Sequence, residues 1–179
     1  MLRKICLFVL LAGSLGCSDR LADMQSACEG TWTLESRTLE DGSVLRPPAV
    51  QGTINWAPID SRKAHVSVTL VNNQGKQQIM DHSLSTYEIS TSAITRKRHA
   101  LIQRGYRERE GHPLSHYIRA KTEKGKASVE GDTVTYFHAA KGETGVEKGG
   151  EEGFRQVYDG DVMTASYSGG FTDTWRRVH

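Results

Sequence analysis

Apolar and polar residues alternate with a period of two along most of this chain, and this alternation limits the folds that it can adopt. Trp32 and Leu34 alternate with polar neighbours, and Val66, Val68 and Leu70 repeat the pattern further on. Such alternation is typical of β-strands with one buried face. It predicts strands at residues 31–35, 53–56, 65–70, 79–85, 87–94, 100–106, 116–121, 133–139, 154–158, 162–167 and 171–178.

Turn sequences separate these segments, as at Asp41-Gly42 and Asp159-Gly160. Such pairs favour tight turns between antiparallel strands. Only residues 19–28 repeat apolar side chains at helical spacing. Many short strands without intervening helices predict an all-β fold, either an antiparallel sandwich or a barrel, with a short N-terminal helix.

The N-terminus has the layout of a secretory signal. Arg3 and Lys4 precede an apolar run at residues 5–12, and small residues connect this run to Cys17. The run is shorter than the roughly twenty residues that a membrane-spanning helix needs. Residues 14–17, Ser-Leu-Gly-Cys, resemble the lipobox of bacterial lipoproteins, in which the cysteine is acylated before the signal is removed. A secretory signal with an incidental cysteine is the alternative.

This resemblance implies that residues 1–16 are a signal peptide and that Cys17 becomes the first residue of the mature protein, acylated with chains such as palmitate. Residues 17–28 would then be the lipidated cysteine with a short helical tether, and residues 29–179 the folded domain. Ser18 follows the cysteine where inner-membrane retention in this family uses aspartate. The resemblance therefore implies an outer-membrane lipoprotein of the cell envelope that faces the periplasm.

Removal of the signal leaves a formally neutral protein. The chain has 23 Lys and Arg against 21 Asp and Glu, and Arg3 and Lys4 leave with the signal. A neutral domain is not expected to bind nucleic acid. Because Cys6 is also removed and Cys17 carries lipid, Cys28 has no intramolecular disulfide partner. We expect Cys28 to be a small, partly buried thiol, and a reactive or intermolecularly paired cysteine is the alternative.

Both ends of the domain resemble lipocalins and bacterial lipocalin-like proteins. Gly30-x-Trp32, just after the expected helix, is similar to their Gly-x-Trp signature, and Trp175-Arg176 is similar to their closing strand. The resemblance implies an up-and-down antiparallel β-barrel of about eight to ten strands. It also implies that Gly30 turns the chain into the barrel, that Trp32 closes one end, and that Arg176 or Arg177 covers the indole ring.

A lipocalin-like barrel would hold a small hydrophobic or amphipathic ligand in its interior. The candidate ligand-binding residues are inward-facing side chains of the expected strands: Trp56, Val66, Val68, Leu70, Tyr136 and Met163. The alternative for each is an ordinary core side chain in a filled barrel. Polar residues assigned to the interior favour an amphipathic ligand over a bare hydrocarbon chain, namely His82, Ser83, Ser85 and Thr135.

Charge is distributed unevenly along the neutral domain. Residues 96–126 hold ten basic and three acidic side chains, and the basic ones are Arg96, Lys97, Arg98, Arg104, Arg107, Arg109, Arg119, Lys121, Lys124 and Lys126. One interpretation is a basic surface that contacts anionic lipid or an envelope protein. The other is a solvated strand face balanced by an acidic, Gly-rich loop at residues 141–152. The first interpretation gives an alternative function, that of a ligand-free interaction protein.

No motif in the sequence indicates catalysis, a metal or a cofactor. His112 and His116 lie four residues apart, but Pro113 disfavours the helix that would bring them together. The sequence contains no nucleophile elbow, phosphate-binding loop or zinc-protease motif. We therefore expect a binding protein without enzymatic activity, metal or cofactor, attached to a membrane through its lipid.

Overall fold

The computed structural model describes residues 12–74, 77–90, 92–106, 121–130, 133–139, 153–167 and 170–179. These residues form one helix, α1 (Ala12–Cys28), and eleven strands. The strands are β1 (Gly30–Leu39), β2 (Val44–Leu45), β3 (Val50–Pro58), β4 (Lys63–Gln74), β5 (Gln77–Ile89), β6 (Ala93–Tyr106), β7 (Lys121–Glu130), β8 (Thr133–Ala139), β9 (Gly153–Asp159), β10 (Val162–Tyr167) and β11 (Phe171–Val178). No helix in this part of the chain is long and apolar enough to span a membrane.

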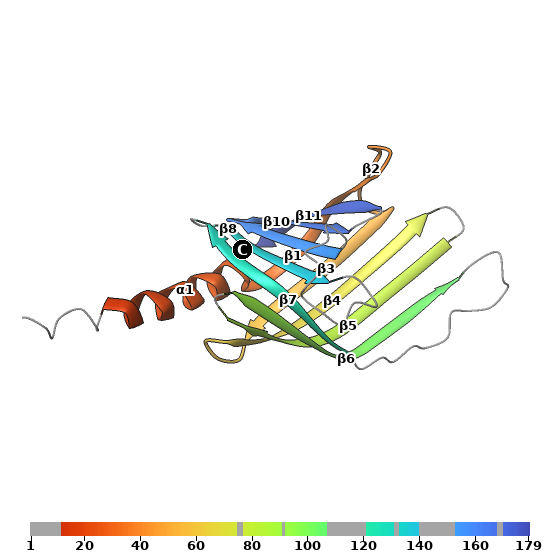
Figure 1. Ribbon diagram of the computed structural model, residues 1–179. Helices are drawn as coiled ribbons and strands as arrows, with labels where there is room; N and C mark the ends of the chain where they lie inside the picture. Colours follow the sequence, from red (N-terminus) through yellow and green to blue (C-terminus); the bar gives the residue numbers. More distant parts are fainter. Residues whose placement is uncertain are drawn as a thin grey trace, which may run out of the picture.

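The strands close into an antiparallel barrel (Figure 1). From β3 to β11, each strand pairs with the next strand in the sequence. Strand β1 pairs with β3 on one side and with β11 on the other. This last pairing closes ten strands, while the short β2 pairs with the end of β1. The predicted up-and-down barrel with a short N-terminal helix is therefore confirmed.

The positions of most strands agree with the alternation, and β8, β10 and β11 coincide with the predicted residues. The predicted strand 87–94 was wrong, because β5 continues to Ile89 and β6 begins at Ala93; the predicted strand 100–106 is the second half of β6, which ends at Tyr106. Ser90 forms the turn between β5 and β6: its N–H donates to the Ala93 carbonyl at 2.8 Å, and its hydroxyl accepts from the Ala93 N–H at 3.0 Å. No Gly, Pro or Asn marks this turn in the sequence.

Strand β7, which spans Lys121–Glu130, was not predicted beyond residue 121, where the predicted strand 116–121 ends. Residues 116–120 lie outside the described part of the chain. The more buried positions of β7 are Glu123, Gly125, Ala127 and Val129. Charged and small residues give only a weak hydrophobic alternation, so the sequence pattern did not reveal this strand.

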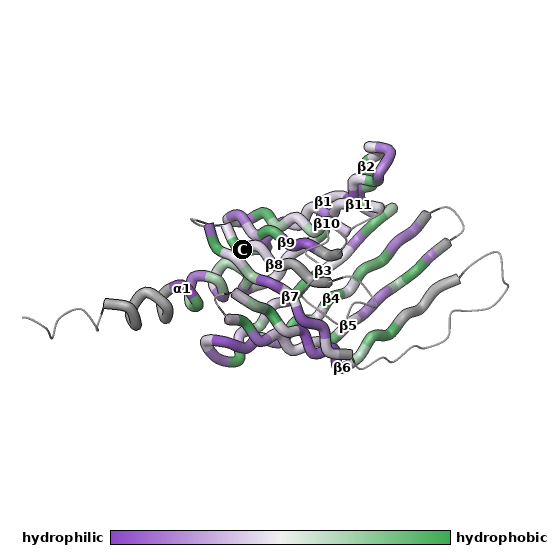
Figure 2. Tube along the Cα trace, in the orientation of Figure 1, coloured by the Kyte–Doolittle hydropathy of each residue, from purple (hydrophilic) through white to green (hydrophobic). Residues whose placement is uncertain are grey.

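Helix α1 lies at one end of the barrel (Figure 1), and its buried residues belong to the main hydrophobic core. Met24 and Cys28 of α1 are fully buried, and apolar and polar residues alternate along many of the strands (Figure 2). Trp32, Trp56, Tyr136 and Tyr158 are the largest fully buried side chains, and the rings of Trp32 and Tyr158 meet edge to face at 5.4 Å between centroids. The helix therefore completes the core at this end.

A buried ion pair joins the two strands that close the barrel. Arg37 of β1 and Asp173 of β11 are partners in register. Arg37 Nε donates to Asp173 Oδ1 at 2.6 Å, and Nη2 donates to Oδ2 at 2.8 Å. The guanidinium also lies 3.7 Å from the centroid of the Phe171 ring. Such a two-pronged contact has a strict geometry and therefore favours one register of β1 against β11.

Candidate ligand-binding site

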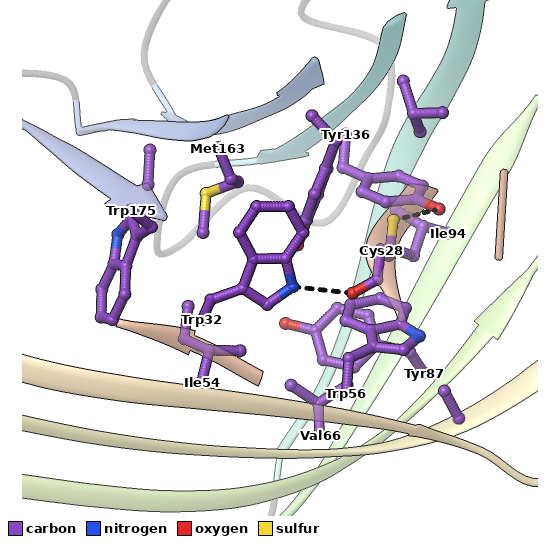
Figure 3. Close-up of a cluster of buried hydrophobic side chains, with 14 of the residues drawn as sticks. Cys28, Trp32, Ile54, Trp56, Val66, Tyr87, Ile94, Tyr136, Met163 and Trp175 are labelled. Atoms are coloured by element: carbon purple, nitrogen blue, oxygen red, sulfur yellow. Dashed lines mark hydrogen bonds between the residues drawn. The ribbon is translucent and has the colours of Figure 1, made fainter. Parts of the chain in front are cut away.

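Trp32 is packed in the core beside Cys28 of α1 (Figure 3). Its side chain is fully buried, and its indole N–H donates to the Cys28 carbonyl at 2.9 Å. Gly30, which opens β1, has a φ of 108°. Other residues rarely adopt this conformation, so the glycine allows the chain to leave α1 and enter β1 directly.

Arg177, rather than Arg176, covers Trp32. Its guanidinium carbon lies 4.6 Å from the centroid of the indole. The same guanidinium donates to the carbonyls of Ala27 at 2.7 Å and Glu29 at 2.9 Å. Carbonyls at the end of a helix lack partners within the helix and carry partial negative charge, so a cation there is stabilising. Arg176 is exposed, and Arg177 thus holds α1 against the barrel.

Tyr136 and Met163, two of the predicted ligand residues, belong to this packed end. Cys28 Sγ donates to Tyr136 Oη at 3.4 Å, and both side chains are fully buried (Figure 3). Burial raises the pKa of the Cys28 thiol to about 12 and the pKa of Tyr136 well above its usual value. Both groups therefore stay protonated near neutral pH, and the thiol is unreactive. Met163 is likewise fully buried.

Next to this packed end, the barrel interior contains a cavity of about 300 Å³. Four of the predicted ligand residues line it: Trp56, Val66, Val68 and Leu70. The other lining residues come from seven strands: Ile54, Asp81, Ser83, Tyr87, Arg96, Arg98, Glu123, Gln156, Tyr158, Ala165, Tyr167 and Trp175.

Two kinds of surface face the cavity. The apolar wall comes from β3, β4 and β11 and consists of Ile54, Trp56, Val66, Val68, Leu70 and Trp175. The charged wall comes from β5, β6 and β7 and consists of Asp81, Ser83, Arg96, Arg98 and Glu123. Ligand pockets commonly combine an apolar lining with a few polar groups that orient the ligand. The two walls together therefore suit an amphipathic molecule.

The centre of the charged wall is a carboxylate shared by two arginines. Arg96 Nη1 donates to Glu123 Oε2 at 3.4 Å, and Arg98 Nη2 lies 3.3 Å and 3.4 Å from the two carboxylate oxygens. Arg96 also donates through Nε to the Ser85 hydroxyl at 3.2 Å. Each of the three charged side chains keeps between 15 and 20% of its surface exposed.

This placement removes Arg96 and Arg98 from the basic surface expected at residues 96–126. Arg96 and Arg98 line the interior, because they alternate along β6 on the same face as the buried Ile94. Lys97, Lys124 and Lys126 are exposed. Part of that segment, residues 107–120, lies outside the described residues.

Four lining residues each hold a buried polar atom without a hydrogen-bond partner among the described residues. These atoms are Trp56 Nε1, Gln156 Oε1, Tyr158 Oη and Trp175 Nε1. Leaving a buried polar group without a hydrogen bond costs about 1–3 kcal/mol. A small rotation of these side chains toward a bound molecule or water would recover part of that free energy.

Gly52 positions Trp175 in the apolar wall. A Cβ atom at position 52 would lie 2.6 Å from Cη2 of Trp175 and 3.1 Å from Cδ1 of Leu70. Real Cβ atoms do not approach other heavy atoms as closely as 2.6 Å. The glycine therefore lets the indole of β11 pack directly against the backbone of β3.

Two of the predicted polar residues face the interior and two do not. Ser83 and Ser85 are buried, and both accept hydrogen bonds from the interior-facing Arg96. The assignment of His82 to the interior was wrong, because neighbours in a strand point to opposite faces and its Nδ1 instead lies 2.8 Å from Thr69 Oγ1. Thr135 likewise alternates with the buried Val134 and Tyr136.

Sequence reasoning did not identify Arg96, Arg98 and Glu123 as cavity residues, nor Gln156 and Trp175. Arg96 and Arg98 share the face of Ile94 because side chains alternate along a strand, but residues 95–98 are all polar, so no hydrophobic alternation marks the inner face there. The register that brings Glu123 opposite Arg96 has no local sequence signal.

Among the described residues, no group of three or more His, Cys, Asp or Glu side chains is arranged to hold a metal ion. His112, His116 and the loop at residues 141–152 lie outside the described part of the chain.

Comparison with known proteins gives no family assignment. No family model matches the chain, and no curated protein matches it in sequence. Among solved structures, the chain is similar to EF1p2_mFAP2b bound to DFHBI, with 11% sequence identity and a TM-score of 0.36. That match covers 88% of this chain and 99% of the other.

Proposed function

We propose that the barrel binds a compact amphipathic molecule in its interior cavity and does so without catalysing a reaction. The observation that carries this proposal is the cavity of about 300 Å³, which has both an apolar and a charged wall. Its volume lies at the lower end of the roughly 300–1,000 Å³ that is common for small-molecule pockets. We therefore expect a compact ligand.

The unpartnered polar atoms support the same proposal. Trp56 and Trp175 can only donate through their indole nitrogens, whereas Gln156 Oε1 can only accept. A molecule with both acceptors and donors can pair with them, whereas an unbranched hydrocarbon chain cannot. We therefore expect the ligand to have polar groups as well as an apolar body.

A cavity-filling substitution tests binding. Val68 is a partly buried residue of the apolar wall, so Val68→Phe would fill the space beside it. Val44→Phe is the matched control, because Val44 lies on β2 and is 50% exposed. A panel of compact amphipathic probes should bind saturably to the wild type and the control, and at least tenfold more weakly to Val68→Phe. Equal affinity in all three proteins would contradict binding in this cavity.

The second part of the proposal is that Cys17 carries a lipid and attaches the barrel to the cell envelope, at the outer membrane facing the periplasm. Its support is the sequence of residues 3–17, with its basic, apolar and small segments before the cysteine. Cys17 lies within α1, which ends at Cys28. Helical residues rise about 1.5 Å each, so such a lipid would hold the barrel within roughly 16 Å of its attachment point.

Mass spectrometry of the protein purified from a bacterial host tests this attachment. We expect a mature chain that begins at Cys17 with added acyl mass, recovered in the membrane fraction. Cys17→Ser should lose the acyl mass and the membrane association, while Cys28→Ser should keep both because Cys28 is buried in the folded domain. A soluble wild-type chain without acyl mass would refute the attachment.

A further inference from the structure

We infer that the ligand of the proposed cavity carries an acidic group, a carboxylate, that Arg96 and Arg98 bind. This inference rests on the proposed function, because it assigns the chemistry of the ligand in the same cavity. The two guanidinium groups are in the lining of the cavity and lie side by side on one face of β6. Their arrangement differs from that of a structural ion pair in three respects.

The first respect is the number of carboxylates. Arg96 and Arg98 converge on the single carboxylate of Glu123, so two positive charges share one negative charge at this point. Asp81 also lines the cavity, on the same face of β5 as Ser83. Both guanidinium groups therefore meet at the same carboxylate.

The second respect is the length of the contacts. The Arg96–Glu123 and Arg98–Glu123 ion pairs measure 3.4 Å and 3.3 Å. By contrast, the two contacts of the buried pair between Arg37 and Asp173 measure 2.6 Å and 2.8 Å. Charge-assisted hydrogen bonds are usually about 2.7–2.9 Å long. The tight pair at the barrel seam is suited to holding strands together, and the looser cluster has room for a second anionic group.

The third respect is the supply of donors. An arginine has five N–H groups, and within the described residues Arg96 uses Nε for Ser85, Nη1 for Glu123 and Nη2 for Ser83 at 3.5 Å. Two N–H groups of Arg96 therefore have no acceptor there. A carboxylate that enters the cavity can accept from them, and the partly enclosed site strengthens such contacts relative to water.

The apolar wall then defines the body of the ligand. Trp56, Val68 and Trp175 offer aromatic and aliphatic surface within the same cavity as the arginines. A compact aryl-alkyl acid satisfies both walls, with its ring against the indoles and its carboxylate at Arg96 and Arg98. The acid 4-phenylbutyrate has these features, and 4-phenyl-1-butanol is its uncharged counterpart of similar size.

Isothermal titration calorimetry of the purified protein with these two probes tests the inference. We expect the acid to bind at least tenfold more tightly than the alcohol. Arg96→Gln should weaken acid binding by about tenfold, whereas Lys97→Gln, which removes the same charge from an exposed neighbour, should leave it within twofold. Glu123→Gln should strengthen acid binding severalfold, because it removes the carboxylate that competes for both arginines.

The opposite effects of Arg96→Gln and Glu123→Gln separate recognition from loss of structure, because a purely structural cluster would weaken binding in both variants. Circular dichroism melting curves verify that each variant is folded. If the alcohol binds as tightly as the acid, or if Glu123→Gln weakens acid binding, the inference is overturned while the proposed function stands. If neither probe nor any member of the wider panel binds, the inference and the proposed function both fail.

Discussion

Replacing Asp173 with Asn should strongly destabilise the barrel. The substitution keeps the size of the side chain but removes the negative charge opposite Arg37, which is only 4% exposed at the seam between β1 and β11. Removing one partner of a buried ion pair typically costs about 3–5 kcal/mol, because the other charge remains buried without compensation. This is a large part of the roughly 5–15 kcal/mol by which a domain is stable.

Urea unfolding followed by circular dichroism measures this loss. Asp159→Asn is the matched control, since Asp159 is exposed at the end of β9, and it should change the free energy of unfolding by less than about 0.5 kcal/mol. The double variant Arg37→Met/Asp173→Leu should be more stable than Asp173→Asn, because it leaves no unpaired charge. A loss below about 1 kcal/mol for Asp173→Asn would refute the role of this pair in closing the barrel.

Three further predictions concern the α1 end and the apolar wall. Arg177→Met should lower the free energy of unfolding by about 1–3 kcal/mol, because it loses contacts to the Trp32 indole and to the helix carbonyls. Arg176→Met should change it by less than about 0.5 kcal/mol. Equal effects of the two variants in urea unfolding would contradict the assignment of Arg177 as the residue that covers Trp32. Above pH 9 the Cys28 thiol keeps its proton in the folded protein but loses it in the unfolded protein. The free energy of unfolding should therefore fall as pH rises, and this group contributes at most about 1.4 kcal/mol per pH unit. Cys28→Ala should show a shallower decline between pH 9 and 10 in the same assay, and an unchanged slope would speak against a buried thiol. Gly52→Ala should displace the Trp175 indole and shift the tryptophan emission maximum, while Gly170→Ala, with open space around it, should not; identical spectra would exclude the close packing.

Much of the fold could be predicted because burial on one face of a strand leaves a direct trace in the sequence. The inward Val66, Val68 and Leu70 alternate with polar neighbours, and β4 forms where they do. The turn at Ser90 was not predicted because it is held by the backbone and hydroxyl of a serine. The sequence has no glycine or proline at this point to mark a turn. Strand β7 was missed because its inward residues are charged or small.

The candidate site could be predicted only in its apolar half. Trp56 and Val68 were assigned to the interior by the alternation of apolar residues, which is the signal that strand periodicity provides. Arg96 and Arg98 have the same periodicity, but charged residues usually lie on the solvated face of a strand, and the sequence gives no reason to turn them inward. Their inward placement depends on Glu123, which the register of β6 against β7 brings beside them.

The indole N–H signals of the three tryptophans provide the most direct test of ligand binding in the cavity. Trp56 and Trp175 line the cavity, whereas Trp32 is bonded to the Cys28 carbonyl at the closed end of the barrel. In a two-dimensional ¹H–¹⁵N NMR titration with 4-phenylbutyrate, the Trp56 and Trp175 signals should shift saturably with one common dissociation constant, and the Trp32 signal should shift little. Unchanged signals from Trp56 and Trp175 up to saturating probe, or shifts confined to Trp32, would contradict a binding site in the barrel interior.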